Sequence, residues 1–148
     1  MLSSPRILAI GTANPPNRYS QREVYDFAAR HVQMYRNARI EHIFMTSDID
    51  YRHFAFEMET LDPNESADEM HERFAIHSVK ISKEAISRCL QQTQLTVQDI
   101  DYIVAVSCTG YLCPGLSAIL IKEMGMRNDL QRADLIGRVV LHLCRAGL

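Results

Sequence analysis

Thiol chemistry is the first possibility that the residue types raise. The 148-residue chain contains four cysteines, at positions 89, 108, 113 and 144. We find no secretory signal before them, so we expect reduced thiols, which as thiolates act as nucleophiles or metal ligands. Cys108 and Cys113 form the only close pair, and no second Cys or His pair follows at zinc-site spacing. We therefore expect no metal site.

The other residue types that commonly carry chemistry are dispersed along the chain. The six histidines include no H-E-x-x-H pair, and there is no P-loop, dinucleotide-binding glycine motif or nucleophile elbow. The formal net charge of −2 argues against a general nucleic-acid binder, which is usually basic. No apolar run approaches the roughly 18 residues of a membrane span. We expect a cytoplasmic protein with no nucleic acid and no membrane partner.

The first half of the chain must position these groups with short elements. The apolar run Ile7–Ile10 ends in a Gly- and Pro-containing turn, which predicts a buried strand. Ser20 and Glu23 form a capping box, so a helix should begin at Ser20 and run to about residue 32. Residues 36–50 have near-helical apolar spacing, and residues 51–58 alternate as in a short strand.

The second half predicts longer elements. Ser66 and Glu69 form a second capping box before a stretch without Gly or Pro, which predicts a helix over residues 67–91. Tyr102–Val106 is a continuous apolar run, typical of a strand covered on both faces. After a loop, the pattern predicts a helix over residues 116–124 that ends at Gly125 and an apolar strand over residues 133–143.

This alternation of strands and helices predicts an α/β fold, with a mainly parallel sheet and covering helices. A parallel sheet needs helices on both faces, and nothing follows the last strand to cover it. We therefore expect an incomplete fold.

Three segments carry a family resemblance. They are ILAIGTANPPNRYSQ at residues 7–21, IDYRHFAF at residues 49–56 and SCTGYLCPGLSAILIKEMGM at residues 107–126. In this order they resemble the type III polyketide synthases, the chalcone and stilbene synthase family, in register from about residue 6 to residue 137. The resemblance implies that residues 1–137 are the incomplete N-terminal half of a thiolase-like fold, followed by a divergent tail at residues 138–148.

The resemblance also implies a reaction, the decarboxylative condensation of malonyl-CoA onto an acyl-CoA starter. A Cys thiolate takes the starter, and a His and an Asn stabilise the thioester oxygen and the enolate. The family uses no bound cofactor beyond its CoA thioester substrates and forms homodimers. Its His and Asn belong to the C-terminal half, so we expect this chain alone to be inactive.

The chain differs from the family at the position of the nucleophile. In register, the family's Cys falls on Val140, and the match is lost after Gly137. One hypothesis is that residues 138–148 come from a shifted reading frame or a spurious gene end. The competing interpretation keeps Cys144 as the nucleophile after a four-residue insertion, because Cys-Arg-Ala-Gly resembles the family's Cys-Ala-Gly pattern.

The loop before the Pro-Gly pair supplies further candidates by resemblance. Cys108 and Thr109 match positions that line the starter pocket, although Cys108 could instead be a small buried thiol. Cys113, with Pro114 and Gly115, matches the loop that reaches across the dimer interface into the partner's active site; the alternative is a plain loop residue. The Cys113–Pro114 bond is also a candidate cis peptide, because such bonds are almost confined to X-Pro.

Arg39 matches one of the basic residues that hold the CoA phosphates in the family. The two other basic positions fall on His42 and Thr46, and Arg36 could compensate for the uncharged threonine. The alternative is that Arg36 and Arg39 belong to a solvated helix face.

Two other functions stay open. The chain could be a non-catalytic half-domain or interaction module that pairs with a homologue through an uncovered sheet edge. It could also belong to the fatty-acid starter condensing enzymes, which share the thiolase-like fold and the Cys nucleophile. The Thr-Gly-x-x-x-Pro-Gly loop and IDYRHFAF fit the polyketide family better.

Overall fold

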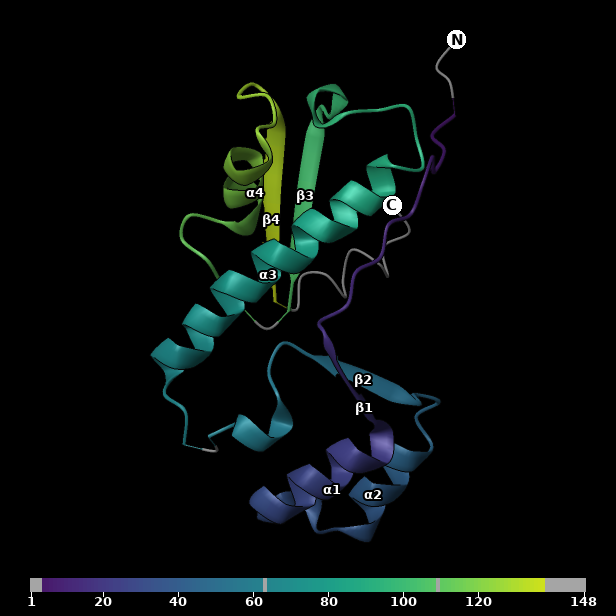
Figure 1. Ribbon diagram of the computed structural model, residues 1–148, viewed down its shortest axis with the longest axis vertical. Helices are drawn as coiled ribbons and strands as arrows, with labels where there is room; N and C mark the ends of the chain where they lie inside the picture. Colours follow the sequence, from purple (N-terminus) through teal and green to yellow (C-terminus); the bar gives the residue numbers. More distant parts are fainter. Residues whose placement is uncertain (1–3, 63, 109, 138–148) are drawn as a thin grey trace. The chain divides into compact units, whose positions relative to one another are not determined.

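The computed structural model describes residues 4–62, 64–108 and 110–137. The described residues form two compact units (Figure 1), one within Asn14–Glu69 and the other combining those up to Ala13 with those from Met70 onward. The helices and strands of the described residues are β1 (Asn17–Ser20), α1 (Gln21–His31), α2 (Ala38–Met45), β2 (Tyr51–Phe54), α3 (Ala67–Leu90), β3 (Tyr102–Ser107), α4 (Leu116–Met124) and β4 (Gln131–Ile136).

The first unit is organised around the start of α1. Ser20 Oγ accepts the Glu23 N–H at 3.2 Å, and Glu23 Oε2 accepts the Ser20 N–H at 2.7 Å. This reciprocal pair is the predicted capping box, and it satisfies N–H groups that the first helical turn leaves without partners. β1, which precedes it, was not predicted; it pairs antiparallel with β2, from Asn17 opposite Phe54 to Ser20 opposite Tyr51.

One buried amide joins three elements of this unit. Gln21 is 6% exposed, and its Nε2 donates to the Phe44 carbonyl at 2.8 Å and to Ser47 Oγ at 3.0 Å. Its Oε1 accepts from Arg52 Nε at 2.7 Å. A buried amide must find such partners because its desolvation is otherwise uncompensated. Gln21 therefore ties the start of α1 to the end of α2 and to β2.

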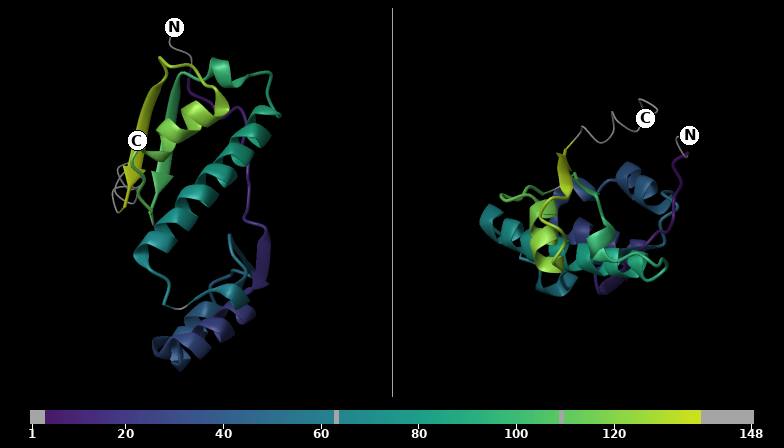
Figure 2. Two further views of the ribbon diagram at one scale, coloured as in Figure 1. Left: turned by 60° about the vertical axis from the view of Figure 1, so that its left-hand side comes forward. Right: turned by 90° about the horizontal axis from the view of Figure 1, so that it is seen from above.

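The second unit contains a parallel pair, with β3 beside β4 in register from Tyr102 opposite Gln131 to Ser107 opposite Ile136. α3 and α4 lie on the same side of this pair (Figures 1 and 2). Side chains alternate along β3, and those of Tyr102, Val104 and Val106 are 53%, 46% and 52% exposed. The expectation that β3 is covered on both faces is therefore wrong for the described residues, because only one face has helices against it.

The start of α3 and the end of α4 lie where the sequence predicts them. Ser66 Oγ accepts the Glu69 N–H at 3.2 Å, and Glu69 Oε2 accepts the Ser66 N–H at 2.8 Å, which completes the second capping box. α4 ends at Gly125, whose φ of +63° lies in the left-handed region that glycine tolerates best.

The prediction of a buried strand at Ile7–Ile10 is wrong. These residues are in no strand, and Ile7, Leu8 and Ile10 are 83%, 61% and 66% exposed. The segment is held instead by side chains near the end of α3. Arg88 Nη1 donates to the Thr12 carbonyl at 2.9 Å, and Gln92 Nε2, from the turn after α3, donates to the Ile10 carbonyl at 2.8 Å. An apolar run is necessary for a buried strand, but it also needs a neighbouring strand, and none accompanies it in the described part of the chain.

The sheet prediction is also only partly right. The described residues form a mixed α/β structure with one parallel pair and one antiparallel pair, rather than a mainly parallel sheet. The expected last strand over residues 133–143 is β4 at Gln131–Ile136. The remainder of that prediction, and the division of the chain at residue 137, fall on residues outside the described part.

Candidate functional site

Apart from Arg39, the predicted site residues that can be placed lie in the segment between β3 and α4. Cys108 follows β3 and is exposed, and Cys113 and Pro114 are exposed in the loop beyond it. Gly115 is half-buried and is the N-cap of α4. The Cys113–Pro114 bond is cis, as expected. Thr109, Val140 and Cys144 lie outside the described residues, so their roles stay predictions.

Exposure decides one alternative for this loop. Cys108 and Cys113 are free thiols that reach solvent, so Cys108 is not the small buried thiol that the sequence left open. Solvent access is required for a thiol to meet a substrate or a partner surface, although it does not assign either role. The predicted pocket and interface roles of these residues stay predictions.

Two contacts hold the first part of this loop. Gly110 lies directly against the Phe74 ring of α3, so that a Cβ at this position would overlap the ring. Leu112 is 6% exposed and anchors the loop in the core. The exposed Cys113 and Pro114 therefore follow directly after a residue that is packed in the core.

The second part of the loop is held by a polar cluster at the start of α4. Ser117 is fully buried, and its N–H donates to Asp134 Oδ1 of β4 at 2.9 Å. The Ser117 hydroxyl donates to Asp134 Oδ2, and Arg132 Nη1 lies 3.6 Å from that oxygen. Sequence analysis assigned no role to Ser117 or Asp134, because their contact arises from the packing of α4 against β4.

The predicted CoA-binding residues lie on α2 and beside it. Arg39 is exposed in the first turn of α2, where its N–H donates to Asn37 Oδ1 at 2.8 Å. Arg36 donates from Nε to the Ala29 carbonyl at 2.8 Å and from Nη2 to the Arg30 carbonyl at 3.0 Å. Arg36 therefore caps the end of α1, and its role in holding phosphates stays a prediction.

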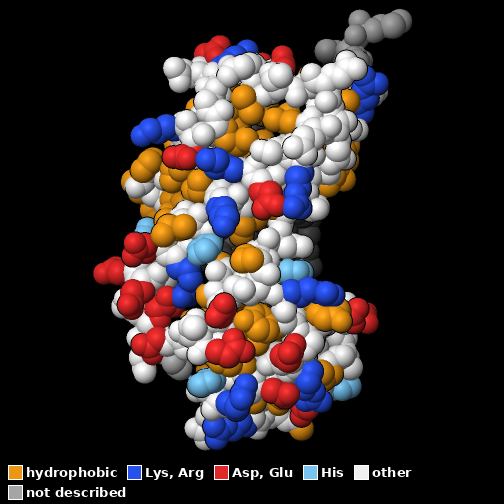
Figure 3. All heavy atoms as spheres, in the orientation of Figure 1, with side chains coloured by type: hydrophobic (Ala, Val, Ile, Leu, Met, Phe, Trp, Pro, Cys, Tyr) orange, Lys and Arg blue, Asp and Glu red, His pale blue; other side chains and the backbone are white. Residues whose placement is uncertain are grey.

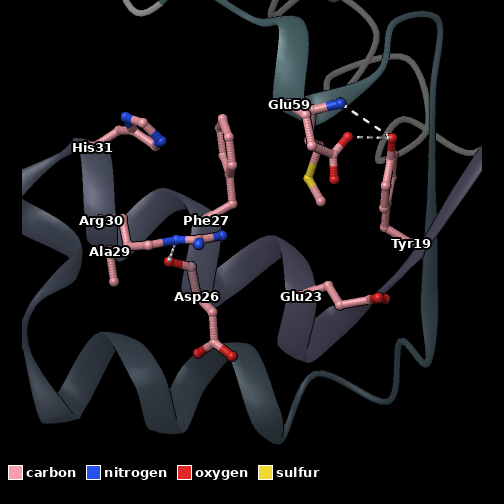
Figure 4. Close-up of a pocket in the computed structure, with 9 residues that line it drawn as sticks. Tyr19, Glu23, Asp26, Phe27, Ala29, Arg30, His31 and Glu59 are labelled. Atoms are coloured by element: carbon pink, nitrogen blue, oxygen red, sulfur yellow. Dashed lines mark hydrogen bonds between the residues drawn. The ribbon is translucent and has the colours of Figure 1, made fainter.

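A cavity of about 760 Å³ in the Asn14–Glu69 unit is a separate feature (Figure 4). Phe27 and Arg30 face Tyr19 and Glu59 across it. The Tyr19 hydroxyl accepts the Met58 N–H at 3.1 Å and donates to Glu59 Oε2 at 3.3 Å. None of the residues predicted from the sequence lines it; the lining residues are Tyr19, Glu23, Asp26, Phe27, Ala29, Arg30, His31, Met58 and Glu59.

The cavity's carboxylates are already engaged. Hydrogen bonds from the Ser20 hydroxyl and backbone N–H lower the pKa of Glu23, which favours its ionised form. Asp26 Oδ1 lies 3.5 Å from Arg22 Nη1, and Glu59 accepts from Tyr19. Engaged carboxylates and the rings of Tyr19 and Phe27 thus line the cavity together.

Metal-ligating groups do not converge in the described part of the chain, where no group of three or more His, Cys, Asp or Glu residues could hold an ion. Nor is any helix within residues 4–62, 64–108 and 110–137 long and apolar enough to cross a membrane.

Comparison with known proteins identifies the family. The model of the N-terminal domain of chalcone and stilbene synthases matches residues 3–147. A 3,5-dihydroxyphenylacetyl-CoA synthase of Streptomyces toyocaensis is 30% identical over 97% of this chain and 35% of its own length. A 1,3,6,8-tetrahydroxynaphthalene synthase of Streptomyces peucetius subsp. caesius is 29% identical over 88% of this chain and 35% of its own length. The chain thus spans about a third of these relatives.

Solved structures agree with this result. PKS-I from the brown alga Ectocarpus siliculosus matches with a TM-score of 0.70 and 25% identity, covering 88% of this chain and 38% of its own. A fungal type III polyketide synthase, ORAS, matches in fold with a TM-score of 0.73 and 20% identity, covering 95% of this chain and 41% of its own. This chain belongs to the chalcone and stilbene synthase family, the type III polyketide synthases, and corresponds to its N-terminal domain.

Proposed function

We propose that these 148 residues are the N-terminal part of an acyltransferase that condenses malonyl-CoA onto an acyl-CoA starter. The family match over residues 3–147 carries this proposal. A cysteine thiolate attacks the starter thioester, and CoA leaves as its thiolate. Malonyl-CoA loses CO₂, and the resulting enolate carbon attacks the enzyme-bound thioester, which releases the cysteine thiolate. Fixed donors aimed at the developing oxyanions lower both barriers.

The described residues contribute the frame of this site rather than its reacting groups. The loop with Cys108 and Cys113 lies between β3 and α4, and Arg39 is exposed on α2. We assign Cys108 and Thr109 to the starter pocket, the Cys113–Gly115 segment to a dimer interface and Arg39 to the CoA phosphates. Homodimerisation and binding of acyl-CoA thioesters belong to this proposal.

A chimera tests the proposal directly. Residues 1–137 are joined to the part of the Streptomyces toyocaensis synthase that follows its matching position, and malonyl-CoA-dependent product formation is measured. We expect activity in the chimera, and none from the 148-residue chain alone, because the family's His and Asn come from the other half. A control rejoins the relative's own two parts at the same junction. An active control with a folded but inactive chimera contradicts the proposal.

The gene sequence tests the assignment of residues 138–148. We expect one frame after codon 137 to continue with Gly-Cys, which would place the nucleophile at the position now occupied by Val140. If no frame continues in this way, Cys144 becomes the candidate nucleophile, and the shifted-frame hypothesis is wrong.

A non-catalytic interaction module is the second candidate, favoured by the exposed apolar row Tyr102, Val104 and Val106 on β3. Apolar side chains also reach the visible surface of the parallel-sheet unit in Figure 3. Gel filtration separates the candidates: a module gives a discrete monomer or dimer, whereas an incomplete enzyme aggregates through its uncovered face.

A further inference from the structure

The first turn of α4 lacks the usual local cap. Gly115 is the N-cap and has no side chain to accept a hydrogen bond. Its carbonyl accepts the N–H groups of Ala118 at 3.0 Å and Ile119 at 3.2 Å. The Ser117 N–H instead donates to Asp134 Oδ1, at 2.9 Å, on β4. The cap of this helix is thus supplied by a neighbouring strand, 17 residues further along the chain.

The carboxylate that supplies the cap is well enclosed. The Asp134 side chain is 17% exposed, and its second oxygen accepts the hydroxyl of the fully buried Ser117. Arg132 Nη1 lies 3.4 Å from Ser117 Oγ, so a cation borders the same cluster. A negative charge at the N-terminal end of a helix is further stabilised by the helix dipole. Each feature favours one fixed arrangement of α4 against β4.

The backbone at Gly115, directly before α4, lies close to the Asp134 carboxylate. Gly115 has a φ of −59°, which every residue adopts, so its backbone does not require glycine. A Cβ built there would lie 2.5 Å from Asp134 Oδ2 and 2.7 Å from Asp134 Cγ. Side-chain atoms do not approach so closely, so a residue larger than glycine would force the carboxylate away.

We propose that Asp134 is a positioning residue that docks the first turn of α4 onto β4 and thereby fixes where the exposed Cys113 and Pro114 lie. Loop and carboxylate are separated by Gly115 alone, so a shift of the carboxylate moves the loop. The consequence for a dimer interface or active site rests on the proposed function. The docking itself does not.

Two measurements on the 148-residue chain test this role. Amide hydrogen exchange reports the Ser117 N–H, and the alkylation rate of Cys113 reports the loop, in a background with Cys89, Cys108 and Cys144 replaced by serine. In Asp134→Ala we expect the Ser117 protection to fall about tenfold or more, because a hydrogen bond to a charged group is lost. We expect the alkylation rate of Cys113 to change in the same variant.

Matched variants separate positioning from general destabilisation. Asp134→Asn keeps an oxygen for the Ser117 N–H, so it should restore most of the protection that Asp134→Ala loses. Asp101→Asn is the control, because Asp101 also pairs with an arginine, Arg127, at 2.7 Å but is 87% exposed. It should leave both measurements unchanged.

A folded Asp134→Ala chain with the parent's Ser117 protection and Cys113 alkylation rate overturns the proposal. If that variant does not fold by circular dichroism, Gly115→Ala decides, because it displaces the carboxylate without removing its charge; unchanged measurements there also overturn the proposal. Neither measurement requires CoA or turnover. An inactive chimera with altered exchange in Asp134→Ala would therefore contradict the proposed function alone.

Discussion

Among the described residues, carboxylates accept backbone N–H groups from capping residues only three positions before them. Glu23 binds Ser20, Glu69 binds Ser66, and Asp99 binds Thr96. The pKa of each carboxyl is lowered, chiefly by hydrogen bonds from its capping residue, because N–H and O–H donors favour the charged form. Each group therefore stabilises its helical turn most when it is ionised.

Replacing Glu23 with glutamine should flatten the pH dependence of stability. The pKa of Glu23 is lower in the folded chain than in the unfolded chain, so its stabilisation is complete above the unfolded value. It is lost as pH falls through the folded value. We expect the melting temperature of the parent to fall more steeply than that of Glu23→Gln between about pH 6 and about pH 3. Glu57→Gln is the control, and equal slopes for the parent and Glu23→Gln would contradict this prediction.

At the scale of elements, the side chain of Gln21 joins the helices and strands of the Asn14–Glu69 unit. Gln21 makes side-chain hydrogen bonds to Phe44, Ser47 and Arg52, and its own N–H donates to the Asp50 carbonyl at 2.8 Å. These partners come from α2, from the turn after it and from β2. The orientation of α2, which carries Arg39, is therefore set by a residue of α1.

Gln21→Leu should loosen α2 while leaving α1 formed. Leucine keeps much of the side-chain volume but leaves the buried partners of Gln21 without their hydrogen bonds. We therefore expect the free energy of unfolding to fall by about 1–3 kcal/mol. Urea denaturation measures the loss, and hydrogen exchange should show faster exchange in α2 than in the parent. Gln33→Leu, at an exposed glutamine, is the matched control. Unchanged exchange in α2 would contradict the role assigned to Gln21.

Elements with local signals could be predicted from the sequence, and those that depend on distant partners could not. The capping boxes at Ser20 and Ser66 and the glycine at position 125 act within one helical turn, and the structure confirms all three. β1 was missed because a polar four-residue segment becomes a strand only through pairing with β2. The strand prediction at Ile7–Ile10 was wrong for the converse reason. An apolar run forms a strand only beside another strand, and the described residues provide none there.

The candidate site also has features that the sequence could predict and features that it could not. The family motif located the loop with Cys108, Cys113 and the cis proline, because the identities of consecutive residues mark it. The contact of Asp134 with Ser117 and Gly115 could not be found, since it depends on how α4 packs against β4. The cavity beside α1 was missed because its lining residues carry no recognisable spacing.

At the scale of the whole molecule, the open face of the parallel pair is an exposed apolar surface. Tyr102, Val104 and Val106 form an apolar row about half exposed to solvent. Such a row favours contact with other apolar surfaces, because burial removes roughly 25 cal/mol per Å² of apolar area from unfavourable hydration. The chain should therefore self-associate at concentrations where a typical monomer does not.

Val104→Lys should reduce this association without lowering the melting temperature. The lysine stands in solvent at the centre of the row, where it opposes contact between two copies. Sedimentation velocity over a concentration series measures the average mass, which should fall relative to the parent. Gln94→Lys adds the same charge at an exposed loop position and should leave the mass unchanged. A variant mass equal to that of the parent would show that another surface drives association.

The attachment of the N-terminal segment to α3 has a consequence for folding during synthesis. The hydrogen bonds from Arg88 to Thr12 and from Gln92 to Ile10 join residues 76 and 82 positions apart. Translation adds about 5–20 residues per second, so the segment waits roughly 4–16 s on the ribosome before its partners emerge. Residues 10 and 12 therefore reach these two contacts only after Arg88 and Gln92 have been synthesised.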